Sequence, residues 1–228
     1  MKHDLVLLTV YFSVFMQFLT SAIQLQGIFI KMPEEHAILT DILKMETIVQ
    51  VIEASFYVWL IFNFKNIKKM ASKRYYDWVI TTPLMLLATI IYMKYLETRE
   101  NVSGHSIIKI KDFLWENSGN ISKITVSNFV MLVFGYLGEV DTMNIVTSVI
   151  LGSVFFLYTF YVIWDQYAKY SVAGKLLFYF LFVVWALYAV AALMTPKYKN
   201  ISYNILDIIS KNFYGLYIYY AIKKIAGH

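Results

Sequence analysis

The chain has 228 residues, of which 59% are hydrophobic and 15% charged, and its formal net charge is +5. Apolar runs of about 20 residues recur along it, which is the length that an α-helix needs to cross a membrane. Cysteine is absent, which excludes disulfides and thiolate sites, and the scattered positions of His3, His36, His105 and His228 argue against a histidine metal cluster.

Seven apolar segments predict an all-α bundle of seven transmembrane helices that forms a single domain over residues 1–228. The positive charge is spread over the connectors, which favours contact with membrane lipids and argues against nucleic-acid binding. No phosphate-binding loop is present, and we expect no enzyme. The expected spans are residues 5–24, 37–64, 75–95, 124–138, 143–167, 172–194 and 201–225.

Two of the segments between the spans are rich in charge. Residues 65–74 predict a basic connector before the third span. Residues 106–116 place Ile107, Ile110, Phe113 and Leu114 on one helical face, which predicts a short helix lying on the membrane surface. A plain amphipathic connector without function is the alternative for this second segment.

The last span contains a carboxylate and an amine in an otherwise apolar run. Asp207 and Lys211 are four residues apart, so their side chains point to the same side of a helix. Lys211 lies about 15 Å into the span, near the middle of a bilayer core that is about 30 Å thick. A bare ammonium group there costs roughly 2.5 kcal/mol or more, so Lys211 must be paired, neutralised or used covalently. An inert ion pair between helices is the alternative.

Polar side chains also recur at helical spacing in the second and third spans. Glu46, Glu53 and Tyr57 share one face of the second span, although Glu46 and Glu53 also fit a purely structural role. In the third span, Pro83 predicts a kink that opens a pocket. Two neighbouring stripes of this span consist of Arg74, Asp77 and Thr81, and of Trp78, Thr82 and Met85.

A lysine in the last of seven spans, with carboxylates on two helices, suggests an amine condensed with an aldehyde as a Schiff base, whose charge needs counter-ions. Residues 74–84, RYYDWVITTPL, resemble the third-helix signature of microbial (type 1) rhodopsins. Residues 207–211, DIISK, resemble their seventh-helix aspartate and retinal-binding lysine. Residues 131–136, MLVFGY, are similar to the proteorhodopsin branch. The resemblance covers essentially the whole chain.

This resemblance implies that Lys211 carries all-trans retinal, that Asp77 and Asp207 are the counter-ion pair, and that Arg74 tunes them from the outer side. It also implies an extracellular N-terminus and a cytoplasmic C-terminus. Trp185 and Tyr188 also fit ordinary core packing. The retinal pocket that the resemblance implies is lined by Tyr57, Trp78, Thr82, Met85, Met131, Gly152, Ser153, Trp185 and Tyr188.

Departures from the family pattern bear on what light does. Ala88 stands where outward proton pumps of this family have a carboxylic proton donor, and Ala189 and Ala192 replace a proline and an aromatic residue of the sixth helix. Glu46 and Glu53 resemble the gate glutamates of channelrhodopsins, and a row of carboxylates attracts cations.

The short loops, the glutamate pair and the additional surface segment look most like the viral rhodopsins of large DNA viruses, and we therefore expect a light-gated cation channel. A light-driven outward proton pump and a sensory photoreceptor that signals to a partner are the alternatives, and homo-oligomer formation stays open. The transported species is accordingly a cation or a proton. Thr82 and Asn128 fall where channelrhodopsins pair the third and fourth helices, and the expected ion pathway contains Glu46, Glu53, Arg74, Thr81 and Asn128.

Overall fold

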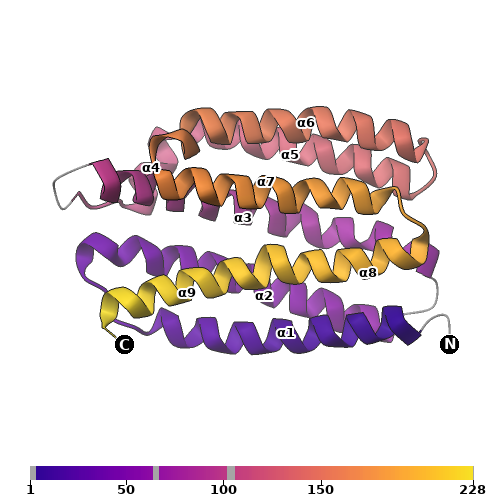
Figure 1. Ribbon diagram of the computed structural model, residues 1–228, viewed down its shortest axis with the longest axis horizontal. Helices are drawn as coiled ribbons and strands as arrows, with labels where there is room; N and C mark the ends of the chain where they lie inside the picture. Colours follow the sequence, from indigo (N-terminus) through magenta and orange to yellow (C-terminus); the bar gives the residue numbers. More distant parts are fainter. Residues whose placement is uncertain (1–3, 64–66, 102–105, 228) are drawn as a thin grey trace.

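Long helices lie side by side along one axis of the molecule (Figure 1). The computed structural model describes residues 4–63, 67–101 and 106–227. His3, His105, His228 and the predicted helix end at residue 64 lie outside these ranges. The elements are α1 (Asp4–Ile28), η1 (Glu34–His36), α2 (Ala37–Phe62), α3 (Ile67–Asn101), α4 (Ile110–Glu116), α5 (Ser118–Glu139), α6 (Ile145–Gln166), η2 (Ala168–Tyr170), α7 (Val172–Ala192), α8 (Pro196–Asp207), η3 (Ile208–Asn212) and α9 (Phe213–Ala226).

Six of the described helices, α1, α2, α3, α5, α6 and α7, are long and apolar enough to cross a membrane. The seventh predicted span consists of α8, η3 and α9, which follow one another without a gap and form one rod in Figure 1. Its middle piece, η3, is a π-helical stretch that contains Lys211. Short π-helical stretches inside α-helices are frequent at functional sites. The predicted all-α bundle of seven helices is confirmed.

The third helix is longer than the sequence predicted. It begins at Ile67, so the described part of the expected basic connector forms the first two turns of α3, and residues 65 and 66 lie outside the described ranges. Met70, Ala71 and Arg74 are buried in the bundle, which explains why helix replaces connector there. The helix continues through Pro83 to Asn101.

Only the later part of the predicted surface helix over 106–116 is present, as α4: residues 106–109, with Ile107, precede the helix, and its apolar face is divided between two environments. Trp115 is 84% exposed, whereas Phe113 is 3% exposed and packs against the ring of Tyr167 on the end of α6, at a centroid distance of 6.2 Å. Phe113 therefore joins the bundle core, whereas Ile107 and Leu114 are 43% and 37% exposed. The expectation of one membrane-facing surface was wrong for this side chain.

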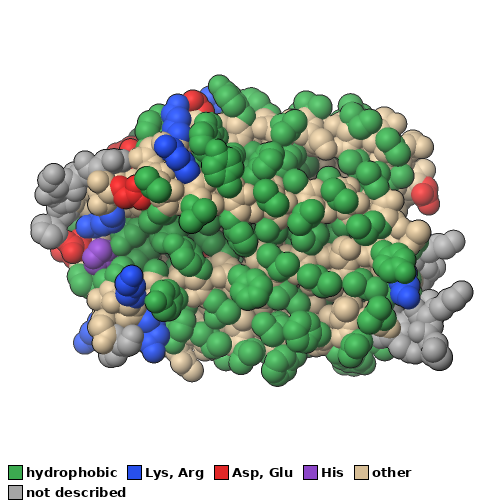
Figure 2. Space-filling view, viewed as in Figure 1, with side chains coloured by type: hydrophobic (Ala, Val, Ile, Leu, Met, Phe, Trp, Pro, Cys, Tyr) green, Lys and Arg blue, Asp and Glu red, His purple; other side chains and the backbone are tan. Residues whose placement is uncertain are grey.

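The bundle has two ends, which we name by the chain termini. The N-terminal end holds the start of α1, the turn between α5 and α6 and the start of α8, and the C-terminal end holds α4, the end of α3 and the end of α9 (Figure 1). On the face shown in Figure 2, hydrophobic side chains cover the middle of the molecule, and charged side chains gather towards the ends. This distribution is the one expected for a surface in contact with lipid tails.

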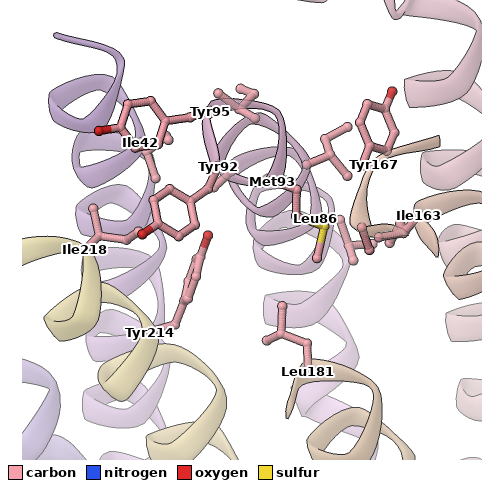
Figure 3. Close-up of a cluster of buried hydrophobic side chains, with 14 of the residues drawn as sticks. Ile42, Leu86, Tyr92, Met93, Tyr95, Ile163, Tyr167, Leu181, Tyr214 and Ile218 are labelled. Carbon is pink, nitrogen blue, oxygen red and sulfur yellow. The ribbon is translucent and has the colours of Figure 1, made fainter. Parts of the chain in front are cut away.

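The C-terminal half of the bundle interior is mainly apolar. Figure 3 shows part of its largest core cluster, in which Ile42, Tyr92 and Ile218 lie close together where α2, α3 and α9 meet. Ala88, the residue at the expected donor position, is fully buried in this cluster. Among the described residues, the expected donor position is therefore surrounded mainly by hydrocarbon side chains.

Small residues bring α5 and α6 close together. A methyl group at Gly138 on α5 would lie 2.7 Å from the Cβ atom of Ser148 on α6. The hydroxyl group of Ser148 donates a hydrogen bond to the carbonyl oxygen of Phe134, at 2.6 Å, which ties the two helices at the same level. Close backbone approach through small residues is a common way to pack membrane helices.

We predict that Gly138→Ala lowers the free energy of unfolding by about 1–3 kcal/mol, because the added methyl group must push α5 and α6 apart. The measurement is thermal unfolding of the purified protein in detergent. Gly119→Ala is the matched control, since no atom lies within 4 Å of a Cβ atom at that position of the same helix. Equal unfolding midpoints for the two variants would contradict the close helix contact.

Candidate functional site

The amino group of Lys211 lies among three buried carboxylates. Its Nζ atom is 2.8 Å from Glu53 Oε1, 3.3 Å from Asp77 Oδ2 and 3.5 Å from Asp207 Oδ1. All four side chains are at most 4% exposed. The predicted partners Asp77 and Asp207 are therefore in place, and Glu53, predicted for the ion pathway, is the nearest of the three. Electrostatic attraction within this cluster therefore links α2, α3 and the seventh rod, which is the span formed by α8, η3 and α9.

A second cation, the guanidinium group of Arg74, holds one of these carboxylates from the N-terminal side. Its Nη1 atom donates to Asp207 Oδ2 at 3.0 Å and to the hydroxyl oxygen of Tyr57 at 2.9 Å, and its Nη2 atom donates to Asn204 Oδ1. Tyr57 and Tyr188 each donate a hydroxyl hydrogen bond to Asp207, at 2.7 and 2.8 Å. Asp207 is therefore fixed from three sides.

Asp77 and Glu53 are less constrained than Asp207. Asp77 Oδ1 and Glu53 Oε2 are buried and have no hydrogen-bond partner among the described residues. Two cations, Lys211 and Arg74, face three carboxylates, which leaves an excess of one negative charge when all five groups are ionised. An uncompensated charge at membrane depth is costly, so this cluster can accommodate one further proton or cation.

An apolar cavity begins at Lys211 and extends between α3, α5, α6 and α7. Its empty space is about 820 Å³, including space open to the outside, and concave sites with mostly apolar walls are typical places for small organic molecules to bind. Its walls are mainly aromatic, aliphatic and small residues. They comprise Tyr75, Trp78, Thr82, Met85, Met131, Leu132, Gly135, Ser148, Val149, Gly152, Ser153, Phe156, Trp185, Ala186, Tyr188, Ala189, Ala192, Tyr203, Ser210 and Lys211.

The structure brings eight of the predicted pocket residues to this cavity: Trp78, Thr82, Met85, Met131, Gly152, Ser153, Trp185 and Tyr188. Tyr57 is placed elsewhere, because its hydroxyl group binds Asp207 and Arg74 and it does not belong to the described lining. Sequence reasoning missed Tyr75 and Tyr203. Tyr75 fits against α5 only because Gly135 has no side chain, a relation between two distant positions that carries no local signal.

The residues predicted for an ion pathway lie on two sides of Lys211. On α3, Thr81 is fully buried one turn from Asp77 and donates its hydroxyl hydrogen to the Asp77 carbonyl oxygen at 3.0 Å. Thr82 accepts a hydrogen bond from Asn128 Nδ2 at 2.8 Å, so the expected link between α3 and α5 exists. On α2, Glu46 is fully buried, and neither of its carboxylate oxygens has a hydrogen-bond partner in the described part of the chain.

Asn204 and the polar residues of α1 were not predicted, because they carry no charge that would mark them within an apolar span. Asn204 binds Arg74, and its Nδ2 atom donates to Thr9 Oγ1 on α1 at 2.7 Å. A signal was present, since Ser13, Gln17 and Gln24 recur at four- and seven-residue intervals in an apolar span. Such spacing places them on one helical face.

The whole chain resembles known proteins in sequence and in fold. A profile of the family described as bacteriorhodopsin-like protein matches residues 7–225. Viral rhodopsin OLPVRII is 30% identical, with a TM-score of 0.80 over 97% of this chain and 99% of that protein. Blue light-absorbing proteorhodopsin from Med12 is 20% identical, with a TM-score of 0.73 over 98% of this chain and 99% of that protein.

A curated relative matches over a shorter region. The green-light absorbing proteorhodopsin of Gamma-proteobacterium EBAC31A08 is 28% identical over an alignment of 163 residues that covers 64% of this chain and 59% of that relative's length. The family profile and the viral rhodopsin structure, by contrast, extend over almost the entire chain. The chain therefore belongs to the bacteriorhodopsin-like family, the microbial rhodopsins.

Proposed function

We propose that this protein is a light receptor in which all-trans retinal is attached to Lys211. Retinal is the chromophore of the family, and the amino group of Lys211 at one end of an apolar cavity supports the attachment. Trp78, Met85 and Trp185 supply the apolar and aromatic surface that suits a polyene. Bound retinal would supply absorption of visible light and an isomerisation that alters the surroundings of the Lys211 nitrogen.

The three carboxylates around the Lys211 nitrogen differ in how they stabilise its positive charge. Asp207 is fixed by Arg74, Tyr57 and Tyr188, so it acts as a permanent negative charge. Asp77 and Glu53 each keep one unpartnered oxygen, so they have the freedom to accept a proton or to meet a cation. A light-driven movement at Lys211 therefore acts first on Asp77 and Glu53, because these two carboxylates contact its amino group directly.

The function that this geometry supports best is a light-gated cation channel with its N-terminus outside the cell. The observation that carries it is the placement of Glu46 and Glu53 on one face of α2, both fully buried and each with an unpartnered carboxylate oxygen. Buried carboxylate oxygens without partners attract cations into a pathway. Glu53 also contacts Lys211, which connects that pathway directly to the site of light absorption.

A light-driven outward proton pump is the second candidate. The similarity to the green-light absorbing proteorhodopsin favours the pump. In a pump, Asp77 would be the proton acceptor. Ala88 leaves α3 without the expected donor, so a pump would need another carboxyl group on the C-terminal side of Lys211. Glu46 is the buried carboxyl group of α2 on that side.

Replacing Lys211 tests the retinal attachment. We predict that wild-type protein supplied with all-trans retinal develops a visible absorption band, and that Lys211→Ala and Lys211→Arg do not. Lys211→Arg keeps a positive charge among the three carboxylates but removes the amine nucleophile, which separates loss of attachment from loss of folding. Folding is checked by gel filtration and circular dichroism. A visible band in a folded Lys211→Arg protein would overturn the assignment.

Recordings of photocurrent against voltage separate the channel from the pump. A channel conducts in either direction, so we predict a photocurrent that reverses sign and whose reversal potential moves when external sodium is replaced by a large organic cation. A pump moves protons one way, so its current keeps one sign over a wide range of voltages. A pigmented protein whose current never reverses would contradict the channel and support the pump.

Glu53→Gln and Glu46→Gln form a matched pair of substitutions on the same face of α2. We predict that Glu53→Gln shifts the visible absorption band and lowers the photocurrent, because it removes the carboxylate 2.8 Å from the Lys211 nitrogen. Glu46→Gln is expected to lower the photocurrent and leave the band in place, since neither carboxylate oxygen of Glu46 has a hydrogen-bond partner among the described residues, Lys211 included. Wild-type spectra and currents in the Glu53→Gln variant would show that Glu53 neither acts on the charge at Lys211 nor belongs to the ion pathway.

A further inference from the structure

A row of uncharged polar side chains follows one face of α1 through the bundle. The row consists of Ser13, Gln17, Thr20, Ser21 and Gln24, each at most 8% exposed. It faces α2 and the seventh rod. At its middle, Asn212 Nδ2 donates to Thr20 Oγ1 at 2.6 Å, and Thr20 lies 3.3 Å from Gln50 Oε1 on α2. The row therefore continues past Lys211 towards the C-terminal end.

Many atoms of this row have no hydrogen-bond partner among the described residues. They include both side-chain polar atoms of Gln17, the hydroxyl of Ser21 and the amide nitrogen of Gln24, and the amide nitrogen of the neighbouring Gln50 on α2 is unpartnered too. Within a bilayer an unsatisfied buried polar group is costly, and water or a passing cation would satisfy these atoms. The row thus extends the path of Glu46 and Glu53 along a second helix.

Gln24 stands where the row ends. Its Oε1 atom accepts a hydrogen bond from Thr47 on α2 at 3.3 Å, and its Nε2 atom is unpartnered. Its carboxamide lies so close to α9 that a methyl group at Gly215 would lie 2.8 Å from Gln24 Cδ. The side chain therefore spans the gap between α2 and α9, and a glycine is required to leave it room.

Directly after Gln24, the interior is closed by apolar side chains of α2 and α9, which we call the apolar seal: Leu43, Ile218, Tyr219 and Ile222. One turn along α1, a methyl group at Gly27 would lie 2.6 Å from the Tyr219 ring and 2.7 Å from Leu43 Cδ2. Ile218 and Ile222 of α9 are fully buried in the adjoining apolar cluster, which contains Ile218 in Figure 3. A cation that travels along the row therefore meets Gln24 as the last buried polar side chain of α1 before the apolar cluster.

We infer that the Gln24 carboxamide, seated against Gly215, is the constriction that selects small cations at the C-terminal end of the pathway. The amide oxygen and nitrogen replace part of the hydration shell of a cation where the path becomes apolar. This inference rests on the proposed channel function. It assigns to an uncharged residue of α1 a specificity role separate from that of Glu46 and Glu53.

The first test removes the amide at constant bulk. We expect Gln24→Leu to reduce the photocurrent roughly tenfold at equal pigment content, because it extends the apolar seal by one turn. Gln26→Leu is the matched control, as Gln26 lies two residues away on the exposed side of α1, and it should keep the wild-type current. A wild-type current in pigmented Gln24→Leu would overturn the inference.

The second test shortens the side chain at position 24 and measures which cations pass. We expect Gln24→Ala to move the reversal potential measured with external methylammonium towards that measured with sodium, because a shorter side chain admits a larger cation. Gly215→Ala should also change the current, since its methyl group displaces the amide without altering any polar residue. These two variants decide the question if Gln24→Leu forms no pigment.

The outcomes distinguish this inference from the function on which it rests. A wild-type current that reverses, together with unchanged selectivity in Gln24→Ala and unchanged current in Gly215→Ala, contradicts the role of Gln24 and leaves the channel intact. A wild-type pigment without a reversing current contradicts the channel, and the role of Gln24 fails with it.

Discussion

The attraction between the buried amino group of Lys211 and three carboxylates is the interaction on which the rest of this structure depends. An ammonium group at membrane depth has no water to solvate it, so it needs negative partners from neighbouring helices. Glu53 from α2 and Asp77 from α3 approach it to 2.8 and 3.3 Å, which draws those helices against the seventh rod. Removing Lys211 would leave three buried carboxylates facing the single cation Arg74, whereas removing one carboxylate would leave two cations facing two anions, so the effect of each change depends on the other groups of the cluster.

Lys211 also separates two environments within the bundle. On one side, α3, α5, α6 and α7 enclose an apolar cavity with aromatic walls. On the other, α1 and α2 present buried amides, hydroxyls and carboxyls, many without partners in the described residues. A change in the position or charge of the Lys211 nitrogen reaches both environments, because the π-helical stretch that carries it lies at their border. This division suits a protein in which light is absorbed on one side and ions respond on the other.

Much of the site was predictable because charge inside a membrane is conspicuous in a sequence. Asp77, Asp207 and Lys211 stand out from apolar spans, and they lie together as expected. The closer position of Glu53 was not predictable, since it depends on the rotation of α2 against α3. Tyr57 shows the same limit. Its spacing placed it correctly on the face of Glu53, but whether its ring would wall the cavity or its hydroxyl would reach Asp207 depends on packing.

By itself, the sequence determined the number of helices, their approximate bounds and the charged residues that must find partners, because a bilayer penalises exposed backbone and unpaired charge at every position. Only the tertiary structure decided which uncharged side chains share a path. Gln24 and Gly215 are far apart in the chain, and neither has a charge that demands a partner. They meet because α1 and α9 pack side by side, and that contact is set by the shapes of the two helices and not by any local pattern.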